Sequence, residues 1–364
     1  MTTIPKSRSN VSTAVSDESQ ALLAGGAAFL ALGAIALLLF VGRDIPLGGP
    51  RSVATAGGVG GAFVAVATFV LSARRVRRSR PESPLFRSGR TRRLVDLGAL
   101  AVAHGLVAFL LWLGLFTLLQ QSFVGAVLYP FAAAVMIGAV GSATAYVTFL
   151  SATRMDAYRL ATLLAVFLVG GMLASMLTAS DPYWWQDNLS ALGKSTDASG
   201  YSFNITLILA GALVTALASF TTRSAGPMSS PASDRPAAPA SDTFSPLEGG
   251  LTLLGVLLAC VGIFPVDEFF AIHNVVASGM VVTYAVLVIG VRRFVPGASA
   301  QFMSLGYVFL AVILVAAILF FPFGYYNLTA VELIAGLLIF TWLIVLVRTL
   351  AAHRSDDDRA SAYR

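Results

Sequence analysis

The stretch QFMSLGYVFLAVILVAAILFF, residues 301–321, contains twenty-one residues and no charged side chain. A helix of about 20 residues rises about 30 Å, which is the thickness of the hydrocarbon core of a bilayer. A helix that is apolar on every side belongs either in the core of a large protein or in a membrane. The composition of the rest of the chain decides between the two.

The 364 residues are 57% hydrophobic and 12% charged, with a mean hydropathy of +0.81. A soluble domain carries about 25% charged residues. The deficit extends over the whole length, so the composition excludes an ordinary soluble domain. The sequence predicts an all-α fold, a polytopic transmembrane helical bundle, placed as a multi-pass protein in the cell membrane.

Ten stretches have the length and composition of a membrane span. They are residues 21–42, 53–73, 94–119, 122–151, 159–179, 203–222, 246–264, 267–291, 301–321 and 328–350. Residues 1–20 are polar, and we expect a disordered N-terminal tail there. Asp17 and Glu18 precede the first span, and no small-residue cleavage site is evident, which argues against a secretory signal peptide.

Positive charge in the connections predicts the orientation of the chain. With the N-terminus in the cytoplasm, 21 of the 24 Lys and Arg residues fall on the cytoplasmic side, nine of them in residues 74–93. The outer side keeps only Arg43, Arg51 and Lys194. This asymmetry predicts that both termini are cytoplasmic. Orientation and anionic lipid explain the basic run, so we expect no nucleic-acid partner.

The spans are expected to form two groups. The first is a four-helix unit, residues 21–152, and the second is a six-helix unit, residues 153–350. Their connections and tail are the basic cytoplasmic loop 74–93, the outer lid loop 180–202, the cytoplasmic linker 223–245 and the cytoplasmic tail 351–364. The linker is rich in Pro, Ser and Ala, a composition typical of a flexible segment.

The polar stretch DPYWWQDNLSALGKSTDASGYSFN, residues 181–204, interrupts the apolar runs on the outer side. Trp184 and Trp185 suit the bilayer interface, because an apolar ring with one polar N–H is stable there. The aspartates, Asp187 among them, could bind a cation, but their spacing matches no calcium loop. Trp185, Leu189 and Leu192 share one side of a short helix, so we predict an ordered lid.

Short motifs accompany this loop. A Leu-Ser-Ala-Leu-Gly element at 189–193 precedes Phe203-Asn204 and Ala210-Gly211, and Gly262-Ile263-Phe264-Pro265 is followed by His273. This order resembles the prokaryotic membrane family called domain of unknown function 998, over about residues 159–350. The resemblance implies a six-span fold with a polar face near these motifs. That family has no established activity, so the resemblance implies no reaction.

Ionisable groups inside spans are costly, and they therefore mark candidate sites. His104 lies ten residues past Leu94, about 15 Å deep. It is either a neutral imidazole bonded to a neighbouring helix, or a ligand contact or metal ligand. His273 lies six residues past Asp267, about 9 Å below the outer surface. It either belongs to a functional pocket or holds residues 181–204 from below.

Two further polar residues are placed near His273. Asn274 shares a helix face with Ser278 at i,i+4 spacing, and we expect a polar stripe that points into the bundle. Glu332 lies at the outer start of the last span. Its carboxylate either reaches the outer interface or pairs with His273, which lies at a similar depth.

The sequence leans against an enzyme. A catalytic zinc site needs three protein ligands, and of the three histidines His353 lies in the cytoplasmic tail. The single cysteine, Cys260, lies within an apolar run, and no GxSxG, P-loop or CxxC motif is present. We therefore expect no catalytic residues, no metal and no cofactor.

The most consistent interpretation is a membrane protein that binds a lipid, another apolar ligand or a partner membrane protein. The partner could also be a second copy of the chain. The predicted site is an outer-leaflet pocket under residues 181–204, with ligand-binding residues Trp184, Trp185, Asp187, His273, Asn274, Glu332 and His104. A secondary transporter is the alternative. His-x-x-Val-Ala occurs in both the third and the eighth span, as an inverted repeat would require, but the loops before these two spans differ greatly in length and no broken helix is evident. An intramembrane hydrolase is the third possibility.

Overall fold

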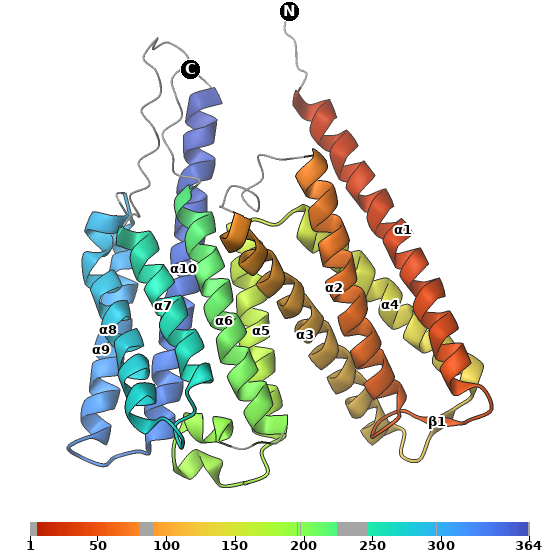
Figure 1. The fold of residues 1–364 in the computed structure, drawn as a ribbon. Helices are drawn as coiled ribbons and strands as arrows, with labels where there is room; N and C mark the ends of the chain where they lie inside the picture. Colours follow the sequence, from red (N-terminus) through yellow and green to blue (C-terminus); the bar gives the residue numbers. More distant parts are fainter. Residues whose placement is uncertain are drawn as a thin grey trace, which may run out of the picture. The chain divides into compact units, whose positions relative to one another are not determined.

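The computed structural model describes residues 6–79, 90–194, 196, 198–223, 246–295 and 297–362. Within these ranges it holds ten α-helices that are long and apolar enough to cross a membrane (Figure 1). The predicted all-α, multi-pass helical fold is therefore confirmed. Contacts divide the chain into two compact units, Met1–Met155 and Asp156–Arg364. Each unit is described by itself.

The first unit contains four helices and one short strand pair. Its elements are α1 (Lys6–Phe40), β1 (Ile45–Pro46), α2 (Val53–Ser79), α3 (Arg90–Ser122), β2 (Val127–Leu128) and α4 (Pro130–Thr153). Helix α1 packs mainly along α4, and α2 packs along α3 and α4. The strands are antiparallel, with Ile45 opposite Leu128. They join the connection after α1 to the connection before α4.

Helix α1 differs from its predicted bounds. It begins at Lys6 and so enters residues 1–20, for which the sequence predicts a disordered tail. Propagating a helix costs much less than starting one, so polar residues without a proline extend a span that has already formed. Helix α10 extends in the same way into residues 351–364 and ends at Ala362. The residues of the predicted tail that lie beyond these helix ends are outside the described part of the chain.

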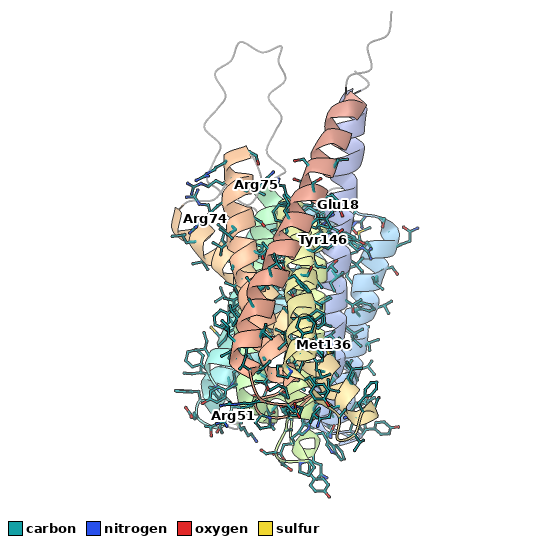
Figure 2. All side chains as sticks on the ribbon, turned by 90° about the vertical axis from the view of Figure 1, so that its right-hand side faces the viewer. Glu18, Arg51, Arg74, Arg75, Met136 and Tyr146 are labelled. Atoms are coloured by element: carbon teal, nitrogen blue, oxygen red, sulfur yellow. The ribbon has the colours of Figure 1, made fainter. Side chains whose placement is uncertain are left out.

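Small residues allow α1 and α4 to approach closely. A Cβ built on Gly141 would lie 2.9 Å from the carbonyl oxygen of Ala28, and one on Gly138 would lie 3.0 Å from that of Phe29. Membrane helices associate through such contacts, because lipid offers no hydrophobic driving force between them. At one end of this contact the Tyr146 hydroxyl donates to the carboxylate of Glu18 (Figure 2).

A cluster of basic residues lies at one end of α2. Arg74 and Arg75 are exposed near the end of the helix, whereas Arg51 lies at the opposite end of the unit (Figure 2). The predicted loop 74–93 is thus helical up to Ser79, and its residues 80–89 are outside the described part of the chain. The orientation that these charges predict stays a prediction.

The second unit contains six helices. Its elements are α5 (Ala157–Leu177), η2 (Trp184–Gln186), η3 (Leu189–Gly193), α6 (Ala198–Arg223), α7 (Pro246–Ile263), α8 (Phe270–Phe294), α9 (Ala300–Phe320) and α10 (Leu328–Ala362). Consecutive helices from α5 to α10 pack on one another, and α10 also packs on α5. The predicted linker 223–245 lies outside the described residues apart from Arg223.

Two contacts hold the interior of this unit. Gly211 on α6 faces Gly255 on α7 so closely that a Cβ on Gly211 would lie 2.3 Å from the Gly255 carbonyl oxygen. Further along, the Trp342 ring on α10 lies fully buried between Tyr284 on α8 and Phe302 on α9, with ring centroids 5.4 and 5.6 Å away. The bundle thus has a core that positions its connections.

Three connections meet at one end of the six-helix unit. They are the lid between α5 and α6, the α7–α8 connection and the α9–α10 connection (Figure 1). The root of the lid is fixed by Ser175 and Ser199, which are both buried and each donate a hydroxyl proton to the other's carbonyl, at 3.0 and 2.9 Å. The α8–α9 connection lies at the opposite end of the unit.

Candidate functional site

The lid is ordered over residues 181–194, as the sequence predicts, but this part is not one short helix. It contains two 3-10 helices that are interrupted at Asp187 and Asn188, where Asn188 has extended backbone with φ −162° and ψ 163°. Leu192 turns inward and is 2% exposed. Trp185 is 49% exposed, because the interruption breaks the spacing that would have placed it beside Leu192.

His273 on α8 is bonded to the lid through one ring nitrogen. Its Nε2 lies 3.0 Å from the Ser190 Oγ, and its Nδ1 lies 2.7 Å from the carbonyl oxygen of Phe264. A carbonyl only accepts, so Nδ1 donates, and in the neutral ring Nε2 then accepts the Ser190 hydroxyl proton. Both side chains are buried. The sequence predicts either a functional pocket or a contact with residues 181–204 for His273. The structure contains that contact, through Ser190.

Glu332 on α10 also bonds to the lid. Its Oε2 accepts from the Leu189 backbone N–H at 2.5 Å, and its carboxylate also accepts from the backbone of Ser190. These N–H groups begin η3 and have no partner within it, so the carboxylate caps the short helix. His273 and Glu332 therefore converge on η3 from two helices. Their predicted pairing with each other is not among the hydrogen bonds of the described residues.

Two asparagines fix the two halves of the lid. Asn327 donates from Nδ2 to the Trp185 carbonyl at 2.6 Å, and its Oδ1 accepts from the Ala330 N–H in the first turn of α10. Asn204 on α6 donates from Nδ2 to the Gly193 carbonyl at 3.1 Å. Asn327 immediately precedes an apolar run, which is the sequence position of a helix N-cap. That signal identifies a cap but not its second bond to the lid.

Three buried oxygen atoms at the lid end have no hydrogen-bond partner among the described residues. They are Asn188 Oδ1 in the lid, Asn204 Oδ1 on α6 and Thr329 Oγ1 on α10. Thr329 is only 4% exposed. Buried polar atoms are nearly always hydrogen-bonded, so each unpartnered atom in a folded protein calls for an explanation.

The prediction that Asn274 points into the bundle is wrong. Asn274 and Ser278 are both exposed, and Asn274 donates to the carbonyl of Phe270 at 2.8 Å. Successive residues on a helix are about 100° apart, so a buried His273 turns Asn274 away from the bundle. The predicted polar stripe does not point inward, and Asn274 does not line a pocket with His273.

Trp184 and Asp187, the other predicted site residues of the lid, lie nearer its surface. Trp184 is half-buried, and Asp187 is exposed and pairs with Lys194 at 3.4 Å. An exposed ion pair of this kind contributes about 0–1 kcal/mol. Of the predicted site residues in this unit, the structure thus brings His273 and Glu332 together around η3 and leaves Asp187 and Asn274 outside.

His104 belongs to the first unit. Its Nδ1 lies 2.7 Å from the Leu100 carbonyl of its own helix, and its Nε2 lies 3.0 Å from the Ser151 Oγ on α4. The ring lies against Phe69 of α2, with centroids 4.9 Å apart. This contact with Ser151 is the hydrogen bond to a neighbouring helix that the sequence predicts as one of two roles for His104. Nothing in these contacts assigns His104 to a ligand.

Metal ligands do not gather in the described part of the chain. No three His, Cys, Asp or Glu side chains among the described residues are grouped so that they could hold an ion. Comparisons of the chain with protein-family models, with curated proteins and with solved structures found no match. The resemblance to domain of unknown function 998 accordingly stays a prediction. The structure supports a multi-pass membrane protein in which hydrogen bonds hold the lid to the helices.

Proposed function

We propose that the six-helix unit binds an amphipathic ligand, a lipid with a hydroxyl or amine donor, under the lid formed by residues 181–204. The observation that carries this proposal is the set of unpartnered oxygens at Asn188, Asn204 and Thr329. All three accept hydrogen bonds, so the ligand that suits them is one that donates. The aliphatic part of the ligand would lie among apolar side chains of the six-helix unit.

The way in which the lid is held supports this proposal. His273, Glu332 and Asn327 each make a hydrogen bond to it, from two different helices. A net intramolecular hydrogen bond contributes only about 0.5–1.5 kcal/mol, because water replaces it when it opens. Opening of the lid breaks these few bonds and exposes Leu192, which is 2% exposed when the lid is closed. Ligand exchange needs such opening.

Exposed aromatic side chains at the same end also suit a lipid. Tyr183, Phe270, Phe323 and Tyr325 are 63 to 73% exposed, and Trp185 is about half exposed. Of these residues, Tyr183, Trp185 and Tyr325 combine an apolar ring with a polar group, and such residues are enriched where a bilayer meets water. This distribution supports a lid at the depth of lipid headgroups, where an amphipathic ligand would enter.

Photo-cross-linking tests this function. A diacylglycerol with a diazirine in its acyl chain supplies the hydroxyl donor without a charge. We expect adducts concentrated on peptides of the lid and the start of α10, and fewer of them in Thr329→Val. Thr349→Val is the matched control, because Thr349 lies at the other end of α10 and donates to Val345 of its own helix. Adducts spread evenly over all spans, or unchanged by Thr329→Val, would contradict the proposal.

One observation favours a second function, hydrolysis of an ester. Ser190 and His273 have the geometry of a nucleophile and its general base, with the Phe264 carbonyl orienting the ring. Ser190 Oγ would attack the ester carbonyl while Nε2 took its proton and passed it to the leaving alcohol. Water would then attack the acyl-Ser190 ester, giving one proton to Nε2, and the acid would leave as Ser190 Oγ regained that proton. Two facts place this second. Glu332 occupies the N–H groups that would stabilise an oxyanion, and His104 has the same arrangement with Ser151 between two helices.

A fluorophosphonate probe separates the two functions. Labelling of Ser190 that is lost in His273→Ala would establish an activated serine and would favour hydrolysis. Ser151 provides the internal comparison, because its hydroxyl is equally close to a histidine. Labelling of neither serine, with cross-linking at the lid retained, is the outcome expected for binding without chemistry.

A further inference from the structure

A groove runs along the α8–α9 contact, at the end of the six-helix unit opposite the lid. Its volume is about 500 Å3. Arg292 at the end of α8 and Met303, Ser304, Tyr307, Val308 and Ala311 on α9 line it. The groove exists because α8 and α9, the least buried spans of this unit, pack loosely on each other.

The groove is polar at one end and apolar along the rest. Arg292 is exposed in the last turn of α8, and no carboxylate among the described residues forms an ion pair with it. The exposed hydroxyl groups of Ser304 and Tyr307 lie in the wall. An arginine binds a phosphate through two parallel N–H bonds, and hydroxyl groups complete such a site. The charge at this end is therefore complementary to an anionic headgroup.

The length of the groove matches one leaflet. From Ala300 to Ala311 the lining of α9 rises about 16 Å. Half of a hydrocarbon core of about 30 Å is about 15 Å. A second hollow of about 530 Å3 shares Ala300, Ser304 and Val308 with the first and adds Gln301 and Leu305. Grooves thus flank both sides of the same half of α9, which suits a lipid with two chains.

We propose that this groove binds an anionic diacyl phospholipid, with its phosphate on Arg292 and one acyl chain along Met303, Val308 and Ala311. The charge distribution of the chain predicts that this end is cytoplasmic, so the lipid belongs to the cytoplasmic leaflet. The site is separate from the lid and does not depend on the function proposed there.

The neighbouring Arg293 provides a matched control. Arg293 is equally charged and exposed at the same helix end, but it does not line the groove. Native mass spectrometry of the detergent-purified chain would count bound phosphatidylglycerol, with phosphatidylcholine as the zwitterionic competitor of zero net charge. We expect Arg292→Gln to weaken phosphatidylglycerol binding about tenfold or more, because it removes a charge-assisted bond to phosphate. Arg293→Gln is expected to weaken phosphatidylglycerol binding less than about fivefold, because it removes only a general attraction between surface charge and anionic lipid.

A second variant tests the apolar half without altering charge. Ala311→Trp fills the groove and is expected to displace the lipid, whereas Val312→Trp adds the same bulk on an exposed position outside the lining. Equal losses in Arg292→Gln and Arg293→Gln would show a general attraction to anionic lipid and would overturn the site. So would phosphatidylcholine that competes as well as phosphatidylglycerol, or retention of the lipid in Ala311→Trp.

Discussion

Removal of the Ser190 hydroxyl is expected to loosen the lid. Ser190→Ala deletes the 3.0 Å bond to His273 Nε2 and leaves that nitrogen, on a ring only 4% exposed, without a partner while the lid is closed. A buried polar atom that loses its partner costs about 1–3 kcal/mol. When the lid is open, water can bond to Nε2. Ser190→Ala therefore destabilises the closed state and leaves the open state nearly unchanged. At about 1.4 kcal/mol per tenfold, the open fraction rises about 5- to 150-fold.

Thiol labelling measures this change. In a Cys260→Ala background, Leu192→Cys places a reporter on the buried face of the lid, at a position that is 2% exposed. When the lid closes faster than the thiol reacts, the labelling rate is proportional to the open fraction. Thr196→Cys, on the exposed part of the lid, gives the rate for a thiol that is always accessible.

Ser151→Ala is the control for this prediction. It removes the same hydroxyl from the same kind of histidine contact, but in the first unit, and it should leave the Leu192→Cys rate unchanged. Labelling of Ser190→Ala that is no faster than that of its parent, or an equal acceleration in Ser151→Ala, would show that the Ser190 hydroxyl does not hold the lid closed.

Three further predictions follow from the fold. An impermeant thiol reagent added outside cells should label Thr196→Cys and not Ser79→Cys; the reverse pattern would invert the predicted orientation. Elemental analysis of the purified protein should find no stoichiometric zinc, because the described residues offer no group of three ligands, and one zinc per chain would revive a metallohydrolase. Gly211→Ala should lower the melting temperature, since its Cβ would lie 2.3 Å from a carbonyl of α7 and such overpacking costs about 1–3 kcal/mol. Gly249→Ala, where a Cβ meets nothing within 4 Å, should not.

The spans are readable from the sequence because each is apolar around most of its circumference, on the faces that contact other helices as well as on those left exposed. Mean hydropathy alone therefore locates them, as residues 301–321 show against α9, Ala300–Phe320. Helix ends are less readable where no turn residue stops the helix. Lys6 begins α1 well before the apolar run, since polar residues outside the bilayer extend a helix at little cost.

The site is only partly readable, for a physical reason. The depth of His273 and of Glu332 follows from their positions along their helices, and both do lie at the lid. The atoms they bind are a hydroxyl and backbone N–H groups of η3, whose positions depend on the break at Asp187. The spacing of apolar residues in the sequence does not predict that break. Asn274 was misplaced because i,i+4 spacing defines a shared face of a helix without saying which way that face points.

The pairing of α1 with α4 has a consequence for how the protein is made. The first helix is complete at Phe40, but its main partner ends at Thr153, roughly 110 residues later. At about 5–20 residues per second of synthesis, α1 waits in the bilayer for about 6 to 20 s. During that time Gly25 and Ala28 face lipid instead of α4, and the β1–β2 pair cannot form. Nascent chains arrested within α3 should therefore expose α1 to proteases or insertion chaperones that completed chains escape.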